Sequence, residues 1–439
     1  MSVWDRIPTP LKLAGLYLAF IALGTALLMM PFSSKAGLTL SEASFTAMSA
    51  VTVTGLSVIS AADDLTFTGQ AILLFLIQIG GVGLIVVTVA VLSALGARAG
   101  IDPRSLLSGD VGIGHRSRLV SMMQRVVKIV VLCELTVAAL LAIAWVPDHG
   151  WAQGMWHAVF HAVSAFNHAG FDIFGNSLQD YRGSPYVLIV VSSAFIASSL
   201  GFIVYSELRT ERHWRLLSLH TKLMISGTLI LLIVPLPIFA TLEWSNSETL
   251  GGLDNIGDKL AASWFAVATP RTAGFAALPT DEMRSGTSFL RSMLMFIGGG
   301  SGSTSGGVKI TTVAVVLLSA IAFYRKSDDV AVFKTAVARG QVHKAVMLIV
   351  VTVLLYLLAT FLLLSTQDAA SEDLRYEATS ALATVGLSRG ATGELDGFGR
   401  AVIMALMFLG RVGPLTLGYL LAAQRPPLTC YPKGEIHLG

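Results

Sequence analysis

Residues 45–56 read FTAMSAVTVTGL, and the same pattern returns at residues 160–171 (FHAVSAFNHAGF), 264–275 (WFAVATPRTAGF) and 376–387 (YEATSALATVGL). Internal repeats of this kind indicate that the whole fold is built from one repeated unit. When the segments are aligned on one glycine, the residue ten positions earlier is always aromatic and the residue eight positions earlier is always alanine. The chain therefore contains four copies of one structural unit. The aligned glycines are Gly55, Gly170, Gly274 and Gly386.

The composition is typical of a protein embedded in lipid. Of the 439 residues, 54% are hydrophobic and 13% are charged, and the mean hydropathy is +0.71, whereas a soluble domain carries roughly a quarter charged residues. A membrane-spanning helix needs about 20 mainly apolar residues. Eight stretches approach this length: residues 14–30, 71–95, 129–146, 186–205, 223–242, 293–323, 345–364 and 401–421.

Basic residues gather in the linkers after the second, fourth and sixth apolar stretches. By the positive-inside rule these linkers lie in the cytoplasm, and so do the N- and C-termini. Topology then explains the net charge of +3, so we expect membrane lipid and no nucleic acid around this protein. The opposite loops are acidic; they either concentrate cations or carry ordinary solvated charges. Cys133 and Cys430 offer neither a disulfide framework nor a zinc-binding spacing.

Each copy is predicted to contain a membrane span, a short helix with an extended stretch that re-enters the membrane, and a second span. Because every linker between copies is basic, all four copies have the same orientation. The expected fold is an all-α membrane protein in which eight spans and four re-entrant pore loops surround a central pore with pseudo-fourfold symmetry. The predicted repeats are residues 1–97, 98–208, 209–326 and 327–424, followed by a cytoplasmic tail at 425–439.

The four glycine segments are predicted to form a selectivity filter. Non-helical backbone at membrane depth must be buried in protein or line a water-filled path, and rings of carbonyl oxygens can replace the water around a cation. The segments carry no ring of Asp or Glu, which favours a weakly hydrated monovalent ion over Ca²⁺. We expect K⁺ to bind at the four glycines. The filter residues are Thr52, Val53, Thr54, Gly55, Asn167, His168, Ala169, Gly170, Arg271, Thr272, Ala273, Gly274, Ala383, Thr384, Val385 and Gly386.

Arg271 stands in the third of these segments, where a cation facing the pore would block it. We expect its guanidinium to point behind the filter, toward a carboxylate or backbone carbonyls.

The sixth apolar stretch is interrupted by a run rich in glycine and serine. Glycine costs about 1 kcal/mol relative to alanine in a helix, so we expect residues 298–309 to unwind within the membrane and form a gate below the filter. A phosphate-binding loop is the competing interpretation, but the Gly-Lys-Ser/Thr ending is missing. The gate residues are Gly298, Gly299, Gly300, Ser301, Gly302, Ser303, Thr304, Ser305, Gly306, Gly307 and Lys309, together with Arg411 in the last span.

A charge at the depth of Arg411 is costly and should face the pore or a partner. We expect Arg411 to hold the gate loop through hydrogen bonds to carbonyls and to form an electrostatic barrier. A structural ion pair is the alternative, with Glu134 and Lys309 as candidate ionisable partners.

These segments closely resemble the Trk/Ktr/HKT superfamily of K⁺ transporters, and the bacterial KtrB type above all. The resemblance extends from residue 14 to residue 421 and includes GGGSGSTSGGVKITT in the sixth stretch and GRVGPLTL in the eighth. It implies that the four glycines belong to a K⁺ filter, that Gly55 rather than serine favours K⁺ over Na⁺, and that residues 298–309 and Arg411 form the gate. Pro270 and Arg389 depart from the expected pattern.

The resemblance also implies K⁺ uptake across the inner (plasma) membrane by a homodimer. Its regulator would be a separate cytosolic nucleotide-binding ring of the KtrA type, and Na⁺ would modulate transport. No cofactor is expected on this chain apart from K⁺ as substrate.

Two other functions fit parts of the sequence. A transporter with Na⁺-coupled alternating access is one, but such proteins often contain inverted repeats, whereas the linker charges here predict parallel ones. A membrane enzyme with Zn²⁺ at His157, His161 and His168 is the other. Only one repeat carries these histidines and no activating glutamate accompanies them, so we expect no enzyme activity.

Overall fold

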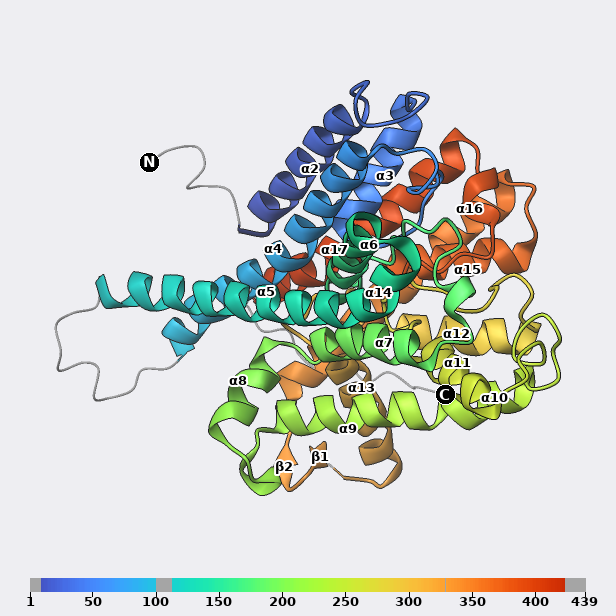
Figure 1. The fold of residues 1–439 in the computed structure, drawn as a ribbon. Coiled ribbons are helices and arrows are strands. Elements are labelled where there is room, and N and C mark those ends of the chain that lie inside the picture. The colour runs from blue at the N-terminus through green and yellow to red at the C-terminus, as the bar shows by residue number, and fades with distance from the viewer. Residues whose placement is uncertain (1–8, 100–112, 328, 423–439) are drawn as a thin grey trace.

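The computed structural model describes residues 9–99, 113–327 and 329–422, which form an almost entirely helical protein (Figure 1). The predicted tail at 425–439 and most of the linker after the second apolar stretch lie outside the described residues. The first quarter of the chain contains α2 (Thr9–Leu28), α3 (Leu40–Thr52) and α4 (Phe67–Ala99). The second contains α5 (Ile113–His149), α6 (Trp151–Asn167), α7 (Pro185–Ser199) and α8 (Phe202–Thr210), with the short helices η2 (Gln179–Tyr181) and η3 (Trp214–Leu216).

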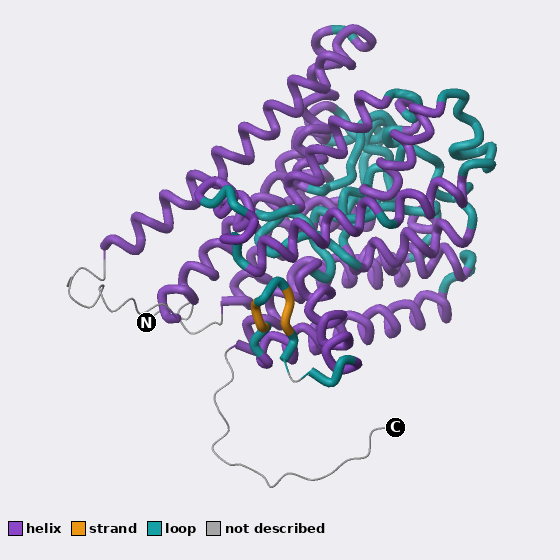
Figure 2. Tube along the Cα trace, turned by 90° about the horizontal axis from the view of Figure 1, so that it is seen from below, coloured by secondary structure: helices purple, strands orange, loops and turns teal. Residues whose placement is uncertain are grey.

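The second half of the chain follows the same order. It begins with α9 (Leu219–Ile233), α10 (Pro235–Glu243), α11 (Ile256–Ala268), α12 (Ser285–Phe296) and α13 (Ile310–Tyr324). It ends with α14 (Arg339–Thr366), α15 (Ser371–Ala383), α16 (Ala391–Glu394) and α17 (Gly397–Ala422). Figure 2 shows the antiparallel hairpin of β1 (Ala331–Val332) and β2 (Thr335–Ala336), which joins α13 to α14 at the edge of the helices.

Within the described residues, three helices are long and apolar enough to cross a membrane: Val126–His149, Leu219–Glu243 and Arg339–Thr366. A fourth candidate is the pair α7 and α8, which is bent by 86°. Three shorter apolar helices cover Ala14–Leu28, Phe67–Gly83 and Ile310–Tyr324. The sequence predicted a single span at 186–205, but the helix breaks at Leu200 and Gly201, where Gly201 has φ +86°.

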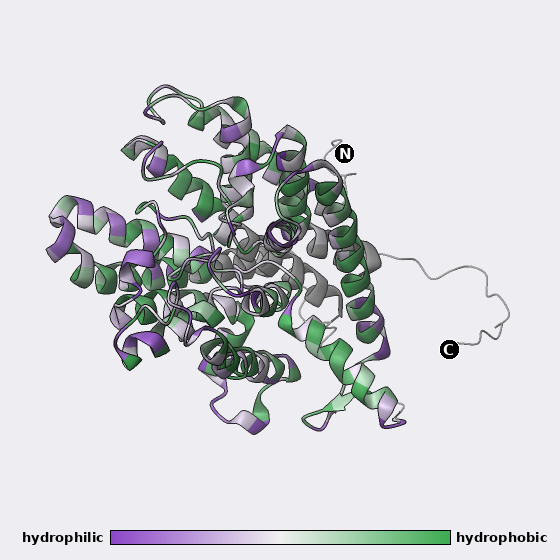
Figure 3. Ribbon diagram, turned by 90° about the vertical axis from the view of Figure 1, so that its right-hand side faces the viewer, coloured by the Kyte–Doolittle hydropathy of each residue, from purple (hydrophilic) through white to green (hydrophobic). Residues whose placement is uncertain are grey.

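Apolar side chains cover both the interior and the outer surface of the helices. Figure 3 shows long hydrophobic stretches along the helices, with hydrophilic residues mainly toward helix ends and loops. Leu132, Ile143 and Phe361 are about two-thirds exposed on helix surfaces. A soluble monomer rarely exposes continuous apolar surface on this scale, so these faces are suited to contact lipid.

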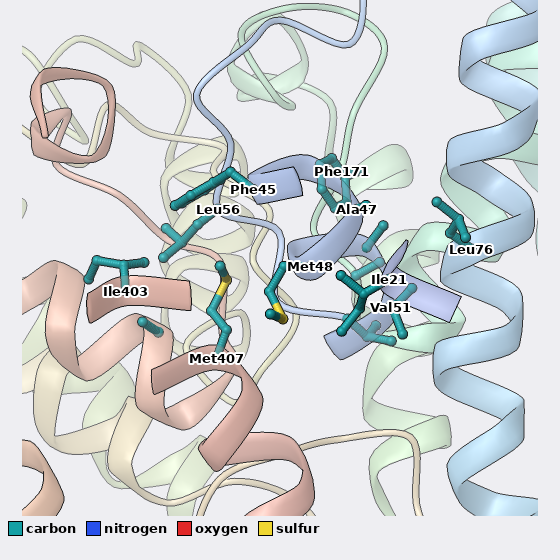
Figure 4. Packing of buried hydrophobic residues seen from close by; sticks show 14 of the residues in the cluster. Ile21, Phe45, Ala47, Met48, Val51, Leu56, Leu76, Phe171, Ile403 and Met407 are labelled. Carbon is teal, nitrogen blue, oxygen red and sulfur yellow. The ribbon is translucent and has the colours of Figure 1, made fainter. Parts of the chain in front are cut away.

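The short helix α3 is held in place by packing against the last quarter of the chain. In the largest buried cluster, Phe45, Met48 and Leu56 around α3 lie near Ile403 and Met407 of α17 (Figure 4). The first and last quarters of the chain therefore pack directly against each other. At its start, α3 carries a capping box in which Thr39 and Glu42 exchange hydrogen bonds, and this arrangement fixes where the helix begins.

Candidate ion pathway

Each of the four short helices α3, α6, α11 and α15 is followed by a backbone turn at the same position relative to its aligned glycine. Two residues before the aligned glycines, Val53, His168, Thr272 and Thr384 have φ of 55°, 63°, 70° and 50°. Such left-handed geometry is uncommon for residues other than glycine. For α3, α6 and α15 this residue is also the C-cap, whose N–H bonds back to the last turn. These three helices stop at this turn, whereas α11 ends earlier, at Ala268, and the chain turns only afterwards, at Thr272.

The four aligned glycines then meet in a closed ring. All have positive φ, with values of 94° for Gly55, 66° for Gly170, 80° for Gly274 and 95° for Gly386. A Cβ built on Gly55 would lie 3.1 Å from the Cα of Gly170, and one on Gly170 would lie 2.8 Å from the Cα of Gly274. A Cβ built on Gly274 would lie 3.4 Å from the Cα of Gly386, and one on Gly386 would lie 3.0 Å from the Cα of Gly55. Only glycine leaves room for four backbones to approach this closely.

Carbonyl oxygens lie between neighbouring glycines of the ring. The Cβ built on Gly55 would be 2.3 Å from the oxygen of Ala169, and that on Gly274 would be 2.4 Å from the oxygen of Val385. On Gly386 it would be 2.2 Å from the oxygen of Thr54. The ring therefore gathers neutral backbone oxygens from different parts of the chain, and such oxygens can coordinate a dehydrated monovalent cation.

A cavity of about 420 Å³ opens directly onto the ring, and all four glycines line it. Its wall also includes the residues two positions after each glycine, which are Ser57, Asp172, Ala276 and Ser388. Asp172 accepts hydrogen bonds from the N–H groups of Phe174 and Gly175. Polar groups thus surround the approach to the ring.

Buried hydroxyl groups hold each glycine segment from behind. Ser49 Oγ accepts a hydrogen bond from the N–H of Gly55 at 3.0 Å, and Ser380 Oγ accepts one from the N–H of Gly386 at 3.1 Å. Ser164 Oγ donates to the carbonyl of Phe171 at 2.7 Å. In the third segment the role passes to Thr269, which donates to the carbonyl of Phe275 at 2.7 Å.

Our sequence reasoning missed these hydroxyls, although a signal was present. A Ser-Ala pair starts six residues before the glycine in three segments, and Ala-Thr replaces it in the third.

Given the resemblance to K⁺ transporters, we expect that replacing Ser49 with alanine lowers K⁺/Na⁺ discrimination several-fold while transport continues. The variant leaves the half-buried N–H of Gly55 without its protein acceptor, which costs about 0.5–1.5 kcal/mol and loosens one side of the ring. Competition of Na⁺ with ⁸⁶Rb⁺ uptake measures the change. Thr46→Val is the matched control, because Thr46 lies buried on the same helix and its hydroxyl has no partner among the described residues. Equal selectivity in both variants would contradict this role for Ser49.

Arg271 is buried within the protein, with 2% of its surface exposed. Its Nη2 lies 3.4 Å from the hydroxyl of Thr228 on α9. We had expected a carboxylate or carbonyls as its partner, and the structure has a threonine hydroxyl instead. In residues 9–99, 113–327 and 329–422, no ion pair involves this guanidinium.

The second segment is tied to its neighbours through Asn167 and His168. Asn167 Nδ2 donates to Glu134 Oε1 at 2.9 Å and to Gln78 Oε1 at 2.8 Å. Gln78 in turn donates to Glu134 Oε2 at 3.1 Å. His168 Nδ1 lies 3.1 Å from the carbonyl oxygen of Thr272 in the next segment.

His157, His161 and His168 form no group that could hold a metal ion among the described residues. His161 Nδ1 lies 2.8 Å from the carbonyl oxygen of its neighbour His157 on the same helix, and its ring stacks on Phe174. Across the described part of the chain, no group of three His, Cys, Asp or Glu side chains could hold a metal ion.

The glycine- and serine-rich run forms a loop between Phe296 and Ile310, where α12 ends and α13 begins. Its two ends are joined by a parallel bridge between Ile297 and Val308, with the N–H of Gly298 donating to Val308 at 2.9 Å. A Cβ on Gly306 would lie 1.8 Å from Thr384 Oγ1. The loop therefore lies directly against the fourth glycine segment.

The break between α7 and α8 provides the docking site for this loop. The N–H of Gly300 donates to the carbonyl of Ser199 at 2.8 Å, and the N–H of Phe202 donates to the carbonyl of Gly302 at 3.1 Å. Backbone groups freed by the bend are thus satisfied by the loop, as buried peptide groups require.

Arg411 joins the loop to α4 in the first quarter of the chain. It is buried, and it donates from Nη1 to the carbonyl of Thr304 at 2.5 Å and from Nη2 to the carbonyl of Gly80 at 3.1 Å. We had considered Glu134 and Lys309 as its partners. Glu134 instead binds Asn167 and Gln78, and Lys309 Nζ donates to the carbonyl of Ser305 at 2.6 Å.

Arg389, which departs from the expected pattern, forms a cluster beside the fourth segment. It pairs with Asp373 at 2.5 Å and donates to Ser288 Oγ at 2.5 Å. It therefore joins the start of α15 to α12.

Comparisons with known proteins show the family of this chain. The family described as "TrkH: Cation transport protein" matches residues 12–426. The chain belongs to this family. It is 38% identical over 436 residues to Ktr system potassium uptake protein B of Bacillus subtilis, covering 99% of this chain and 98% of that protein. It is 36% identical over 427 residues to the protein of the same name from Vibrio alginolyticus, covering 96% and 93%.

Among solved structures, the crystal structure of the potassium transporter TrkH from Vibrio parahaemolyticus is similar, with a TM-score of 0.76. The match covers 95% of this chain and 86% of that one at 18% identity, so it shows the shared fold. The relatives in this family are named as uptake proteins, and the chain is accordingly a transporter and not an enzyme.

Proposed function

We propose that this protein takes up K⁺ through the ring of four glycine segments, which acts as its selectivity filter. The observation that carries the proposal is the closed contact of Gly55, Gly170, Gly274 and Gly386 beneath a polar cavity. Two relatives named Ktr system potassium uptake protein B are 38% and 36% identical to this chain. Neutral carbonyl oxygens favour a weakly hydrated ion such as K⁺.

The filter is surrounded by four parallel repeats in the plasma membrane, and the N- and C-termini are cytoplasmic. Two contacts support the common orientation. The rings of Trp214 and Phe333, from the linkers after the fourth and sixth apolar stretches, have centroids 6.0 Å apart. The N–H of Leu178, after the second glycine segment, donates to the carbonyl of Ala276, after the third, at 3.0 Å. The two basic linkers therefore lie on one side of the protein together, and the loops after the second and third glycine segments also lie together.

The loop at 298–309 is the gate, and Arg411 holds it closed. The support is steric, because Gly306 lies against Thr384 at the entrance to the fourth segment. Control comes from a separate cytosolic nucleotide-binding ring, as the words "Ktr system" in the relatives' names suggest a further component. The protein works as a homodimer, and Na⁺ modulates its transport.

Uptake of ⁸⁶Rb⁺ into proteoliposomes, with K⁺ and Na⁺ as competitors, tests this function. We expect K⁺ to compete with ⁸⁶Rb⁺ far better than Na⁺ does. Equal competition by the two ions would refute a K⁺-selective filter. Uptake that requires an inward Na⁺ gradient would favour coupled transport over a conducting pore.

A further inference from the structure

A second cavity, of about 190 Å³, lies beside the gate and away from the ring. It is enclosed by α12, α14, α15 and α17, whose order along the chain can be followed in Figure 1, and by the end of the gate loop. Its wall is mainly apolar, with Phe296 from α12, Leu355 from α14 and Leu382 from α15. It is larger than the ~150 Å³ apolar cavity that stays dry and binds benzene.

The serine and threonine hydroxyls of this wall are already occupied. Ser292 donates to Ser288, Thr352 donates to Leu348, and Thr379 donates to Arg375, in each case to a backbone carbonyl one helical turn away, at 2.8–2.9 Å. A buried water needs two to four polar partners. These hydroxyl groups already donate their hydrogen bonds within their own helices. Apart from these three hydroxyls and the phenol of Tyr356, the side chains that line the cavity are apolar, which favours an apolar occupant.

The mouth of the cavity faces outward. Phe289 and Met293, which line it on α12, are 67% and 56% exposed. In a transporter of this family the apolar outer surface is in contact with lipid, whose acyl chains are the apolar molecules at highest concentration there. We propose that an acyl chain of a bilayer lipid enters between α12 and α14 and fills this cavity.

Such a chain would touch the gate directly. Gly307 and Val308, which close the end of the gate loop, form part of the cavity wall. Gly410, next to Arg411, and Ala383, next to Thr384, also line it. A bound chain stabilises the loop in the position seen here, because moving Val308 would open a void beside the chain. This effect on flux rests on the proposed function, whereas binding of the lipid does not.

The test compares two tryptophan variants of adjacent residues on α14. Val351 lines the cavity, whereas Val350 is 49% exposed outside it. Val351→Trp should fill the cavity, and Val350→Trp adds the same bulk to the outer surface. The milder Leu355→Phe provides a second filling variant if Val351→Trp does not fold.

The probe is a phosphatidylcholine vesicle that contains a trace of phosphatidylcholine with a diazirine on one acyl chain. After illumination, peptide mass spectrometry should find labels on Val351 and Leu355 in the parent protein, reduced by roughly fivefold in Val351→Trp but not in Val350→Trp. Labelling of the outer face alone, or equal labelling of Val351→Trp at Leu355, would overturn the proposal. A Val351→Cys variant that forms a disulfide between two copies would also overturn it, because a second chain would then cover the cavity.

The same variants separate the two proposals. Labelling without selective ⁸⁶Rb⁺ uptake would leave the lipid site standing and refute the K⁺ filter. If both are present, Val351→Trp should lower ⁸⁶Rb⁺ uptake severalfold relative to Val350→Trp, because a covalently attached side chain fills the cavity permanently, whereas a lipid chain exchanges and leaves the loop free to move at intervals. Equal uptake would refute the coupling between lipid and gate.

Discussion

A Gly55→Ser variant is expected to transport K⁺ but to lose at least roughly tenfold of its discrimination against Na⁺. Gly55 has φ +94°, and its Cβ would lie 2.3 Å from the carbonyl oxygen of Ala169. A non-glycine residue held in such a conformation costs about 1–3 kcal/mol, and the carbonyl must also move away. Because that oxygen belongs to the next segment of the ring, one substitution disturbs two of the four segments.

The measurement is the ratio of K⁺ to Na⁺ needed to halve ⁸⁶Rb⁺ uptake. Gly37→Ser serves as the control, because Gly37 has φ +85° with nothing within 4 Å of a built Cβ. Gly37→Ser places a serine in a similarly strained backbone conformation, but its Cβ contacts no carbonyl. If Gly37→Ser changed selectivity as much as Gly55→Ser, or if neither changed it, Gly55 would not belong to the filter.

The repeated segments were readable from sequence because their constraints are local and recur four times. The glycines need positive φ, and α3, α6 and α15 stop three residues before them. The unwinding of 298–309 was also readable, since so many glycines cannot stay helical; the structure has a loop from Ile297 to Lys309.

Contacts between distant residues could not be read in this way. The partner of Arg271 is Thr228, 43 residues earlier, and nothing in either segment specifies that pairing. The 86° bend between α7 and α8 depends on one glycine and on the gate loop that fills the break. Likewise, Glu134 finds Asn167 and Gln78 only because three helices converge there.

Deleting residues 299–306 is expected to raise ⁸⁶Rb⁺ uptake by roughly fivefold or more, because we propose that this segment obstructs the path below the filter. The deletion is sterically favourable. A Cβ built on Gly307 lies 3.4 Å from the Cα of Gly298, so the two ends are already neighbours. The variant also removes the carbonyl of Thr304, to which Arg411 donates, and so releases the contact that we propose holds the gate.

Higher uptake alone would not distinguish an open gate from a leak around a damaged protein. Adding Gly55→Ser to the deletion resolves this, because ions that pass through the ring must meet the altered segment. The double variant should show the high rate of the deletion together with the poor selectivity of Gly55→Ser. If the double variant had the high rate but the same selectivity as the deletion alone, the ions would be passing outside the ring. Lower uptake at normal expression would instead make the loop a scaffold for α12 and α13.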